Sequence, residues 1–149
     1  MHELNILATS ASGALRYVMQ HFCKPGITEY PERTDTYAVI SIQDTVHGGL
    51  GFELKENDYC KGVLTLYFDD IEKPQTDAQR FTNEQAAEII RFIRAHSDDV
   101  DSLLIHCFAG ISRSKAVAKF AREMLGLPPM NDNFYNEYVY AMLKQNHHE

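Results

Sequence analysis

Apolar and polar positions alternate along this chain with two different periods. Four short apolar runs rich in β-branched residues, each bounded by polar or turn residues, predict buried strands at 4–8, 38–42, 63–68 and 103–106. The segments between them repeat their apolar positions every three to four residues, as a helix with one buried side does. Strands and helices are therefore expected to alternate.

The clearest helical pattern starts at Thr82. The sequence Thr-Asn-Glu-Gln at 82–85 fits a capping box, in which a threonine and a glutamine three residues later satisfy the first free N–H groups of a helix. We expect this helix to end near Ser97. Its buried side is predicted to consist of Ala86, Ile89, Ile90 and Ile93.

Three further helices are predicted from the same spacing. One starts just after Gly110, and Gly126 with the two prolines at 128–129 ends it. Another runs over about 133–144, and a weaker one covers about 12–22. The expected buried positions are Ala116, Val117, Phe120, Ala121 and Met124 in the first of these, and Phe134, Tyr138, Val139 and Met142 in the second.

This alternation predicts the fold class. Nearly continuous apolar strands separated by helices favour an α/β fold, with a central, mostly parallel sheet of four to five strands flanked by helices. At 149 residues the chain fits one domain over 1–149. Residues 43–62 are the least patterned, and we expect a long loop there that is either a cover for a site or an ordinary insertion.

Composition excludes several classes of protein. The formal net charge is −7 and lysine and arginine form no run, so we expect no nucleic-acid partner. No apolar stretch is long enough for a membrane span and the first residues lack a secretory pattern, so we expect a cytoplasmic protein with no membrane partner. The three cysteines form no close pair, which favours reduced thiols. Cys23 is expected to be a half-buried thiol and Cys60 a loop residue.

The strongest chemical signal is the segment 106–114, His-Cys-Phe-Ala-Gly-Ile-Ser-Arg-Ser. Cys107 follows a predicted strand and precedes a predicted helix, which places it at the carboxyl edge of the sheet, where open α/β folds bind ligands. A short loop that turns into a helix N-terminus directs several N–H groups, and the positive end of the helix dipole, at one point. We therefore expect an anion cradle, formed by Phe108, Ala109, Gly110, Ile111, Ser112 and Arg113.

Two side chains of this loop could act on a bound phosphate group. A thiol at a helix N-terminus near an arginine ionises more readily than a free cysteine, so we expect Cys107 to be a thiolate nucleophile at neutral pH. Arg113 can give two parallel hydrogen bonds to phosphate oxygens and stays charged. Gly110 suits a backbone that curls around a phosphate.

The motif resembles that of a known superfamily. His106-Cys107, five residues and then Arg113-Ser114 is similar to the signature of protein tyrosine phosphatases, and Ala-Gly-Ile-Ser-Arg-Ser resembles the dual-specificity branch. Length and motif position resemble the compact tyrosine-phosphatase-like proteins of bacteria and phages. The similar segments are 39–42, 68–71, 81–82 and 136–140, so the resemblance spans 38–143.

The resemblance implies a mechanism. The cysteine attacks phosphorus to form a cysteinyl-phosphate, an aspartic acid protonates the leaving oxygen, and water releases phosphate without metal or cofactor. Asp70 is the expected acid because it stands directly before an apolar residue, as in related small phosphatases. Asp69 is the alternative and Asp44 the reserve. The larger tyrosine phosphatases have Trp-Pro before this aspartate, and this chain does not.

Supporting roles are considered for five other positions. Ser114 resembles the hydroxyl that assists departure of the thiolate, although serine at a helix start is also a common cap. His106 is expected to order the loop through backbone hydrogen bonds. Lys115 either attracts anionic substrates or is simply solvated. Asn136 and Tyr140 either brace the loop or fill the core, and packing is favoured.

The function predicted from these observations is phosphomonoester hydrolysis, as a protein tyrosine or dual-specificity phosphatase acting on a phosphorylated protein or a small phosphomonoester. One alternative is a phosphate-binding module with little turnover. Another is a phosphatase for a phosphoinositide or an RNA 5′-triphosphate, which the absence of lysine between Cys107 and Arg113 disfavours. A third alternative is arsenate reduction or sulfur transfer. Arsenate reduction normally needs a resolving cysteine that forms a disulfide, and Cys23 and Cys60 give no sequence sign of this role.

Overall fold

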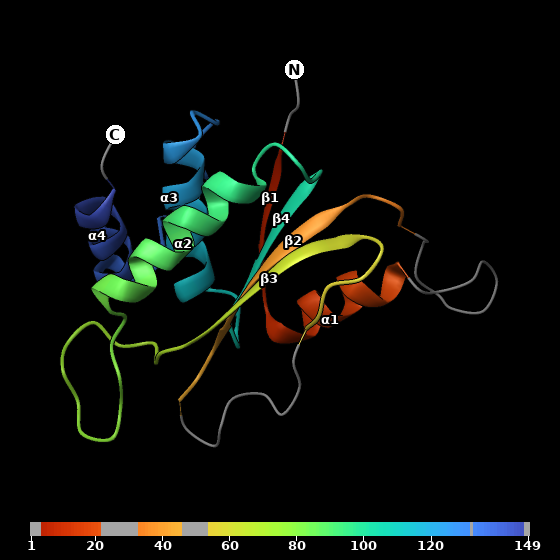
Figure 1. Cartoon of the computed structure of the whole chain (residues 1–149). Helices are drawn as coiled ribbons and strands as arrows, with labels where there is room; N and C mark the ends of the chain where they lie inside the picture. Colours follow the sequence, from red (N-terminus) through yellow and green to blue (C-terminus); the bar gives the residue numbers. More distant parts are fainter. Residues whose placement is uncertain (1–3, 22–32, 46–53, 132, 148–149) are drawn as a thin grey trace.

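The computed structural model describes residues 4–21, 33–45, 54–131 and 133–147. Within these ranges the chain forms four strands and four helices (Figure 1). In chain order they are β1 (Asn5–Thr9), α1 (Ala11–Gln20), β2 (Tyr37–Gln43), β3 (Cys60–Tyr67), α2 (Asn83–His96), β4 (Ser102–His106), α3 (Arg113–Met124) and α4 (Glu137–Asn146).

The four strands form one parallel sheet in the order β1-β4-β2-β3. Helices α2, α3 and α4 lie together on one face and α1 lies on the other, so the sheet is covered on both sides (Figure 1). The central strands β2 and β4 are buried at every position, because each has a strand on both sides and helices on both faces. Their continuous apolar sequences follow from this position.

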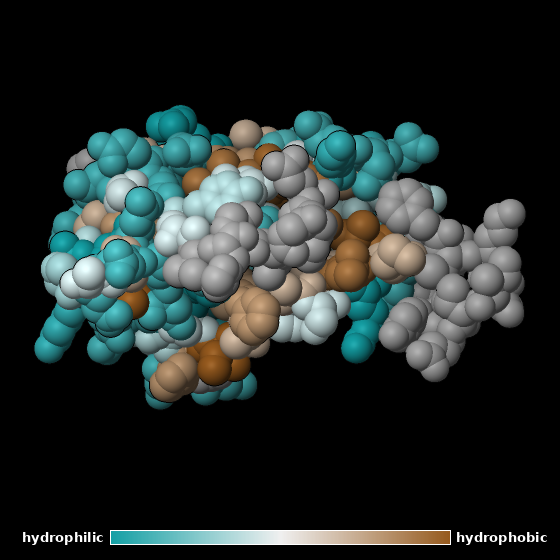
Figure 2. Space-filling model, turned by 90° about the horizontal axis from the view of Figure 1, so that it is seen from below, coloured by the Kyte–Doolittle hydropathy of each residue, from teal (hydrophilic) through white to brown (hydrophobic). Residues whose placement is uncertain are grey.

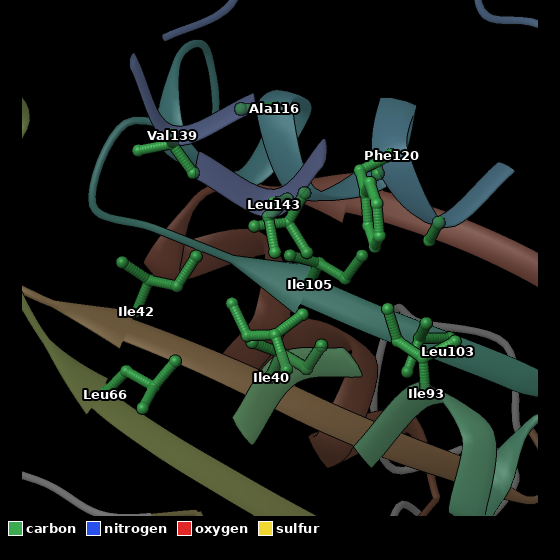
Figure 3. Close-up of a cluster of buried hydrophobic side chains, with 14 of the residues drawn as sticks. Ile40, Ile42, Leu66, Ile93, Leu103, Ile105, Ala116, Phe120, Val139 and Leu143 are labelled. Carbon is green, nitrogen blue, oxygen red and sulfur yellow. The ribbon is translucent and has the colours of Figure 1, made fainter. Parts of the chain in front are cut away.

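The larger core lies between the sheet and helices α2, α3 and α4. Figure 3 shows Ile40, Ile105 and Leu103 of the central strands facing Phe120 of α3 and Leu143 of α4. All five side chains are at most 2% exposed. The smaller core packs α1 against the opposite face of the same strands. Its fully enclosed members include Ala14, Tyr37, Val39 and Leu104.

The predicted fold class is confirmed, with four strands in the described ranges. The predicted capping box is also present: the Thr82 hydroxyl accepts from the Gln85 N–H, and the Gln85 side chain accepts from the Thr82 N–H. The helix that follows ends at His96, one residue before the predicted limit. The segment 12–22 was predicted as a weaker helix, and α1 covers Ala11–Gln20.

Three local predictions were wrong. The last helix begins at Glu137, because Asn136 caps it, so Phe134 lies before the helix and is 64% exposed instead of buried. Helix α3 begins at Arg113, which leaves residues 111–112 in the loop. Cys60 is the first residue of β3 and is 1% exposed, so it is a core residue, whereas Cys23 lies outside the described residues.

The carboxyl ends of all four strands meet at one edge of the sheet. The residues that follow them are Ser10 after β1, Asp44 after β2, the segment 68–70 after β3, and Cys107 after β4. Residues far apart in sequence are therefore brought together at this edge. No helix in the described ranges is long and apolar enough to cross a membrane.

Candidate active site

The loop between β4 and α3 is held against the turn between β1 and α1. The Ala11 N–H donates to the Phe108 carbonyl at 3.1 Å, and the Cys107 N–H donates to the Thr9 carbonyl at 3.3 Å. Gly110 has a φ of +76°, and a Cβ at that position would lie 2.4 Å from the Ser10 nitrogen. Glycine is therefore required at position 110 by both its backbone angle and the neighbouring chain.

Cys107 lies at the base of this loop and is 2% exposed. Its Sγ atom accepts from the Gly110 N–H at 3.2 Å, and the Ser114 hydroxyl oxygen lies 3.2 Å from it. Ser114, in the first turn of α3, is completely buried. The Cys107 thiol donates to the Ser114 hydroxyl here. That hydroxyl and the Gly110 N–H could both donate to a thiolate, and the N-terminus of α3 favours a negative charge at this point.

Arg113 is the first residue of α3, and its side chain turns toward the end of β2. One guanidinium nitrogen, Nη1, contacts the Asp44 carboxylate at 2.7 Å and donates to the Phe68 carbonyl, also at 2.7 Å. The residue is only 3% exposed, and among the described residues its Nε–H has no hydrogen-bond partner. A buried N–H without a partner costs free energy, so this donor is available for an acceptor that enters the site.

The two candidate aspartates have different surroundings. Asp69 is 7% exposed and accepts from the Thr45 N–H at 3.0 Å, the Thr45 hydroxyl at 2.5 Å and the Gln79 N–H at 2.7 Å. Burial alone would raise the pKa of Asp69, but these hydrogen bonds and the charge of Arg113 together lower it. Asp69 is therefore a fixed carboxylate that ties two loops to the end of β3.

Asp70 faces the cradle instead. Its Oδ1 atom accepts from the Ser112 hydroxyl at 2.8 Å and from the side-chain amide of Asn136, also at 2.8 Å. Ser112 belongs to the cradle loop and Asn136 caps α4. The expected acid is thus held beside the loop that carries Cys107 and is exposed to solvent.

Asp44, the reserve acid, is instead the ion-pair partner of Arg113 and is 42% exposed. Because its carboxylate is paired with Arg113, Asp44 is a less suitable proton donor to a leaving group than Asp70. Lys115 lies in the first turn of α3 and is half-buried. The Tyr140 hydroxyl donates to Glu123 at 2.5 Å, near the C-terminal end of α3, whereas the cradle loop precedes its N-terminus, so this hydroxyl does not brace the cradle.

His106 anchors a buried row of polar side chains under the loop. Its Nδ1 lies 3.4 Å from the Cys107 carbonyl, which can only accept, so Nδ1 carries the proton. Nε2 then accepts from the Ser41 hydroxyl at 2.7 Å, and the Gln43 amide donates to Ser41 at 3.3 Å. Burial, followed by the charge of Arg113, lowers the pKa of His106, which keeps the ring neutral.

The mouth of the site combines apolar and polar surface. Phe108 and Ile111 are 60% and 52% exposed, so these two members of the cradle loop face solvent. Figure 2 shows the molecule from below, with apolar patches between polar ones. Beside Asp70 lies a cavity of about 450 Å³, and it is lined by Asp70, Ile71, Glu72, Lys73, Gln75, Ser112 and Asn136.

Several of these side-chain contacts were not predicted from the sequence. Ser41 and Gln43 lie in the strand Tyr37–Gln43, and the only sign of a buried polar contact was a serine in an otherwise apolar run. Packing was favoured for Asn136, but its amide bonds to Asp70, so that prediction was wrong. Its position three residues before a buried valine was the available sign of a cap. Among the described residues, no group of three or more histidine, cysteine or acidic side chains could hold a metal ion.

Comparison with known proteins gave matches among solved structures. No family model matches the chain, and no curated protein matches it. Among solved structures, the chain is similar to the crystal structure of Tk-PTP in the active form. The two are 17% identical, the match covers 98% of this chain and 80% of that one, and the TM-score is 0.45.

Proposed function

We propose that this protein is a phosphomonoester hydrolase that works through a cysteinyl-phosphate intermediate. The observation that carries the proposal is the loop at the start of α3. There a buried thiol accepts from the Gly110 N–H, and the Nε–H of a buried arginine has no partner within the part of the chain that the structure describes. A phosphoryl group has oxygens for these donors and a phosphorus atom for the thiolate to attack.

The ion pair at Arg113 supports this use of the arginine. Because Asp44 and the Phe68 carbonyl both engage Nη1, the guanidinium is fixed at one corner. A fixed guanidinium can offer its remaining donors to phosphate oxygens in one plane, which lowers the cost of ordering the side chain when substrate binds. Asp44 is therefore a positioning residue for Arg113 in this proposal.

In the first step the Cys107 Sγ forms a bond to phosphorus and the ester P–O bond breaks. Asp70 transfers its proton to the departing oxygen, so that an alcohol or phenol leaves instead of its anion. In the second step water attacks phosphorus and the P–S bond breaks. The Asp70 carboxylate takes the proton of that water, and the Ser114 hydroxyl donates to the returning thiolate.

Asp70, and not Asp69, is assigned as the acid on the basis of its contacts. Asp69 uses both carboxylate oxygens to bind Thr45 and Gln79, so its pKa is lowered and it holds structure. Asp70 is exposed and joined to the cradle through Ser112. Tyrosine or dual specificity toward a phosphorylated protein is the finer form of this proposal. The exposed Phe108 and Ile111 at the mouth support it, because they offer apolar surface to a peptide.

Turnover of p-nitrophenyl phosphate tests the proposal. We expect the wild type to release nitrophenol and Cys107→Ser to show no turnover above buffer, with an unchanged unfolding midpoint. A Cys107→Ser protein that still hydrolyses the ester would contradict the mechanism. Negligible turnover by both proteins, together with tight phosphate binding, would identify a binding module.

A further inference from the structure

Asn136 is buried and joins three parts of the site. It is 2% exposed, and its N–H donates to the Ser112 carbonyl at 3.2 Å. Its Oδ1 atom accepts from the Val139 N–H at 3.0 Å, which caps α4. Its Nδ2 atom donates to Asp70 Oδ1 at 2.8 Å and to the Ile71 carbonyl at 3.3 Å. One residue, through its backbone N–H and its side-chain amide, thus connects α4, the cradle loop and the segment that carries Asp70.

The orientation of this amide is fixed by its neighbours. The Val139 N–H can only donate and the Ile71 carbonyl can only accept, so the amide oxygen must face Val139 and the NH₂ group must face Asp70. Rotating the amide by half a turn would break both contacts. Asp70 therefore always faces a donor at this position.

The consequence concerns the two oxygens of Asp70. Oδ1 accepts from both Asn136 and Ser112, which engages both of its lone pairs. An NH₂ group cannot accept a hydrogen bond, so a proton on Oδ1 would face a donor. Among the described residues, the Asp70 Oδ2 atom has no hydrogen-bond partner, because both contacts of the carboxylate are to Oδ1. The proton of a protonated Asp70 is therefore restricted to Oδ2.

We propose that Asn136 is a positioning residue that holds Asp70 beside the cradle and places its acidic proton on Oδ2. This inference rests on the proposed function, in which Asp70 protonates the leaving oxygen. Asn136 acts through Asp70 and is not itself a catalytic residue. The helix cap and the placement of the acid are two tasks of the same amide, carried by different atoms.

Asn136→Ser separates these two tasks. Serine is as good a helix cap as asparagine, so the Val139 N–H keeps an acceptor, but the donor to Asp70 is lost. We expect kcat for alkyl phosphates, whose leaving oxygen needs a proton, to fall roughly 10- to 100-fold. With p-nitrophenyl phosphate, whose leaving group departs readily as an anion, kcat should be nearly unchanged. The unfolding midpoint should stay close to that of the wild type.

The double variant with Asp70→Asn shows whether Asn136 acts through Asp70. In the Asp70→Asn background we expect Asn136→Ser to have no further effect on either substrate. Equal losses for alkyl and aryl phosphates, or a full additional loss in the double variant, would overturn the proposal. If Asp70→Asn itself behaved as the wild type on alkyl phosphates, both the acid assignment and this proposal would fail. The Cys107→Ser result would then still decide whether the chain is a cysteine phosphatase.

Asn136→Asp provides a second readout that a cap alone does not affect. It keeps a side-chain acceptor for Val139 but places a second carboxylate against Asp70. Repulsion between the two charges should keep Asp70 protonated to higher pH, so the alkaline limb of the kcat profile for alkyl phosphates moves upward. An unmoved limb, in a protein of normal stability, would contradict direct contact between the two side chains during catalysis.

Discussion

Two polar clusters, one at each end of the sheet, differ in how completely their groups are satisfied. At the amino ends of β2 and β4, the Asp35 carboxylate accepts from Tyr17, from Arg33 at 3.0 Å and from Ser102 at 3.1 Å, and His21 lies 3.2 Å away. At the carboxyl ends, Arg113 is buried like the core residues, yet its Nε–H has no partner among the residues that the structure describes.

This difference separates stability from function. A carboxylate that already accepts from several neighbouring side chains, as Asp35 does, stabilises the fold and is occupied by the protein itself. The carboxyl-end cluster keeps a buried donor free and an acid exposed, at a cost in stability that a bound anion would remove. We therefore expect substitutions at the two ends of the sheet to act on different properties of the protein.

The largest expected effect comes from replacing one aspartate at each end of the sheet by asparagine and comparing the two variants. Asp70→Asn should lower kcat/KM for alkyl phosphates by about 10²- to 10⁴-fold, because the leaving oxygen loses its proton donor, and should leave the unfolding midpoint unchanged. Asp35→Asn, at the other end, should leave kcat unchanged. Steady-state kinetics and thermal unfolding of both variants check this, and a loss of activity in Asp35→Asn would break the separation.

Asp69→Asn is the control nearest to the acid. It should lower the free energy of unfolding by roughly 1–3 kcal/mol, because its hydrogen bonds hold Thr45 and Gln79. A leaving-group-dependent loss of kcat in Asp69→Asn, with none in Asp70→Asn, would reverse the assignment of the acid.

The next effect concerns the free donor of Arg113. Arg113→Lys removes the planar set of donors, and we expect kcat/KM to fall by about 10²- to 10³-fold. Inorganic phosphate should raise the unfolding midpoint of the wild type and of Asp35→Asn, but not that of Arg113→Lys. If phosphate stabilised all three proteins equally, the anion would bind elsewhere.

Alanine substitutions at two glycines test how closely the cradle loop packs against its neighbours. Gly110 and Gly126 both have positive φ angles, but a Cβ meets the Ser10 backbone at position 110 and nothing within 4 Å at position 126. Gly126→Ala should cost about 1 kcal/mol of unfolding free energy, and Gly110→Ala at least about 2 kcal/mol. Denaturant unfolding of the two variants tests this, and equal costs would mean that the loop can move away from Ser10.

The smallest effect is a pH dependence at the amino-end cluster. Although burial raises it, hydrogen bonds from Arg33 and Tyr17 lower the pKa of Asp35 to about 2. Because the folded pKa lies below the unfolded one, the stabilisation is present above about pH 4 and is lost as pH falls toward 2. We expect a difference of about 1–2 kcal/mol between wild type and Asp35→Asn that shrinks over this window. A difference that does not change between pH 5 and 2 would contradict the charge on Asp35.

The sequence predicted those parts of the molecule that depend on local pattern. Buried strands, the capping box at Thr82 and the cradle between strand and helix are all specified by residues close together in the chain. Long-range pairings carry no such signal. The contact between Asp44 and Arg113 and that between Asp70 and Asn136 join residues more than sixty positions apart, and only the folded sheet brings them together.

The wrong predictions have the same origin. An apolar periodicity does not show where a helix begins, so Phe134 was included in α4 although Asn136 caps it two residues later. Cys60 was predicted in a loop because it falls within residues 43–62, the least patterned part of the sequence, yet β3 starts there beside Tyr37. The Asp35 cluster had no sequence signal, since a lone aspartate before a strand is usually solvated.

The most direct test of the account is to trap the intermediate. The wild type is mixed with an aryl phosphate, quenched rapidly in acid, digested and analysed by mass spectrometry. We expect one added phosphoryl group on the peptide that contains Cys107, and none in Cys107→Ser. Turnover without any phosphorylated Cys107, or with the phosphoryl group on another residue, would contradict it.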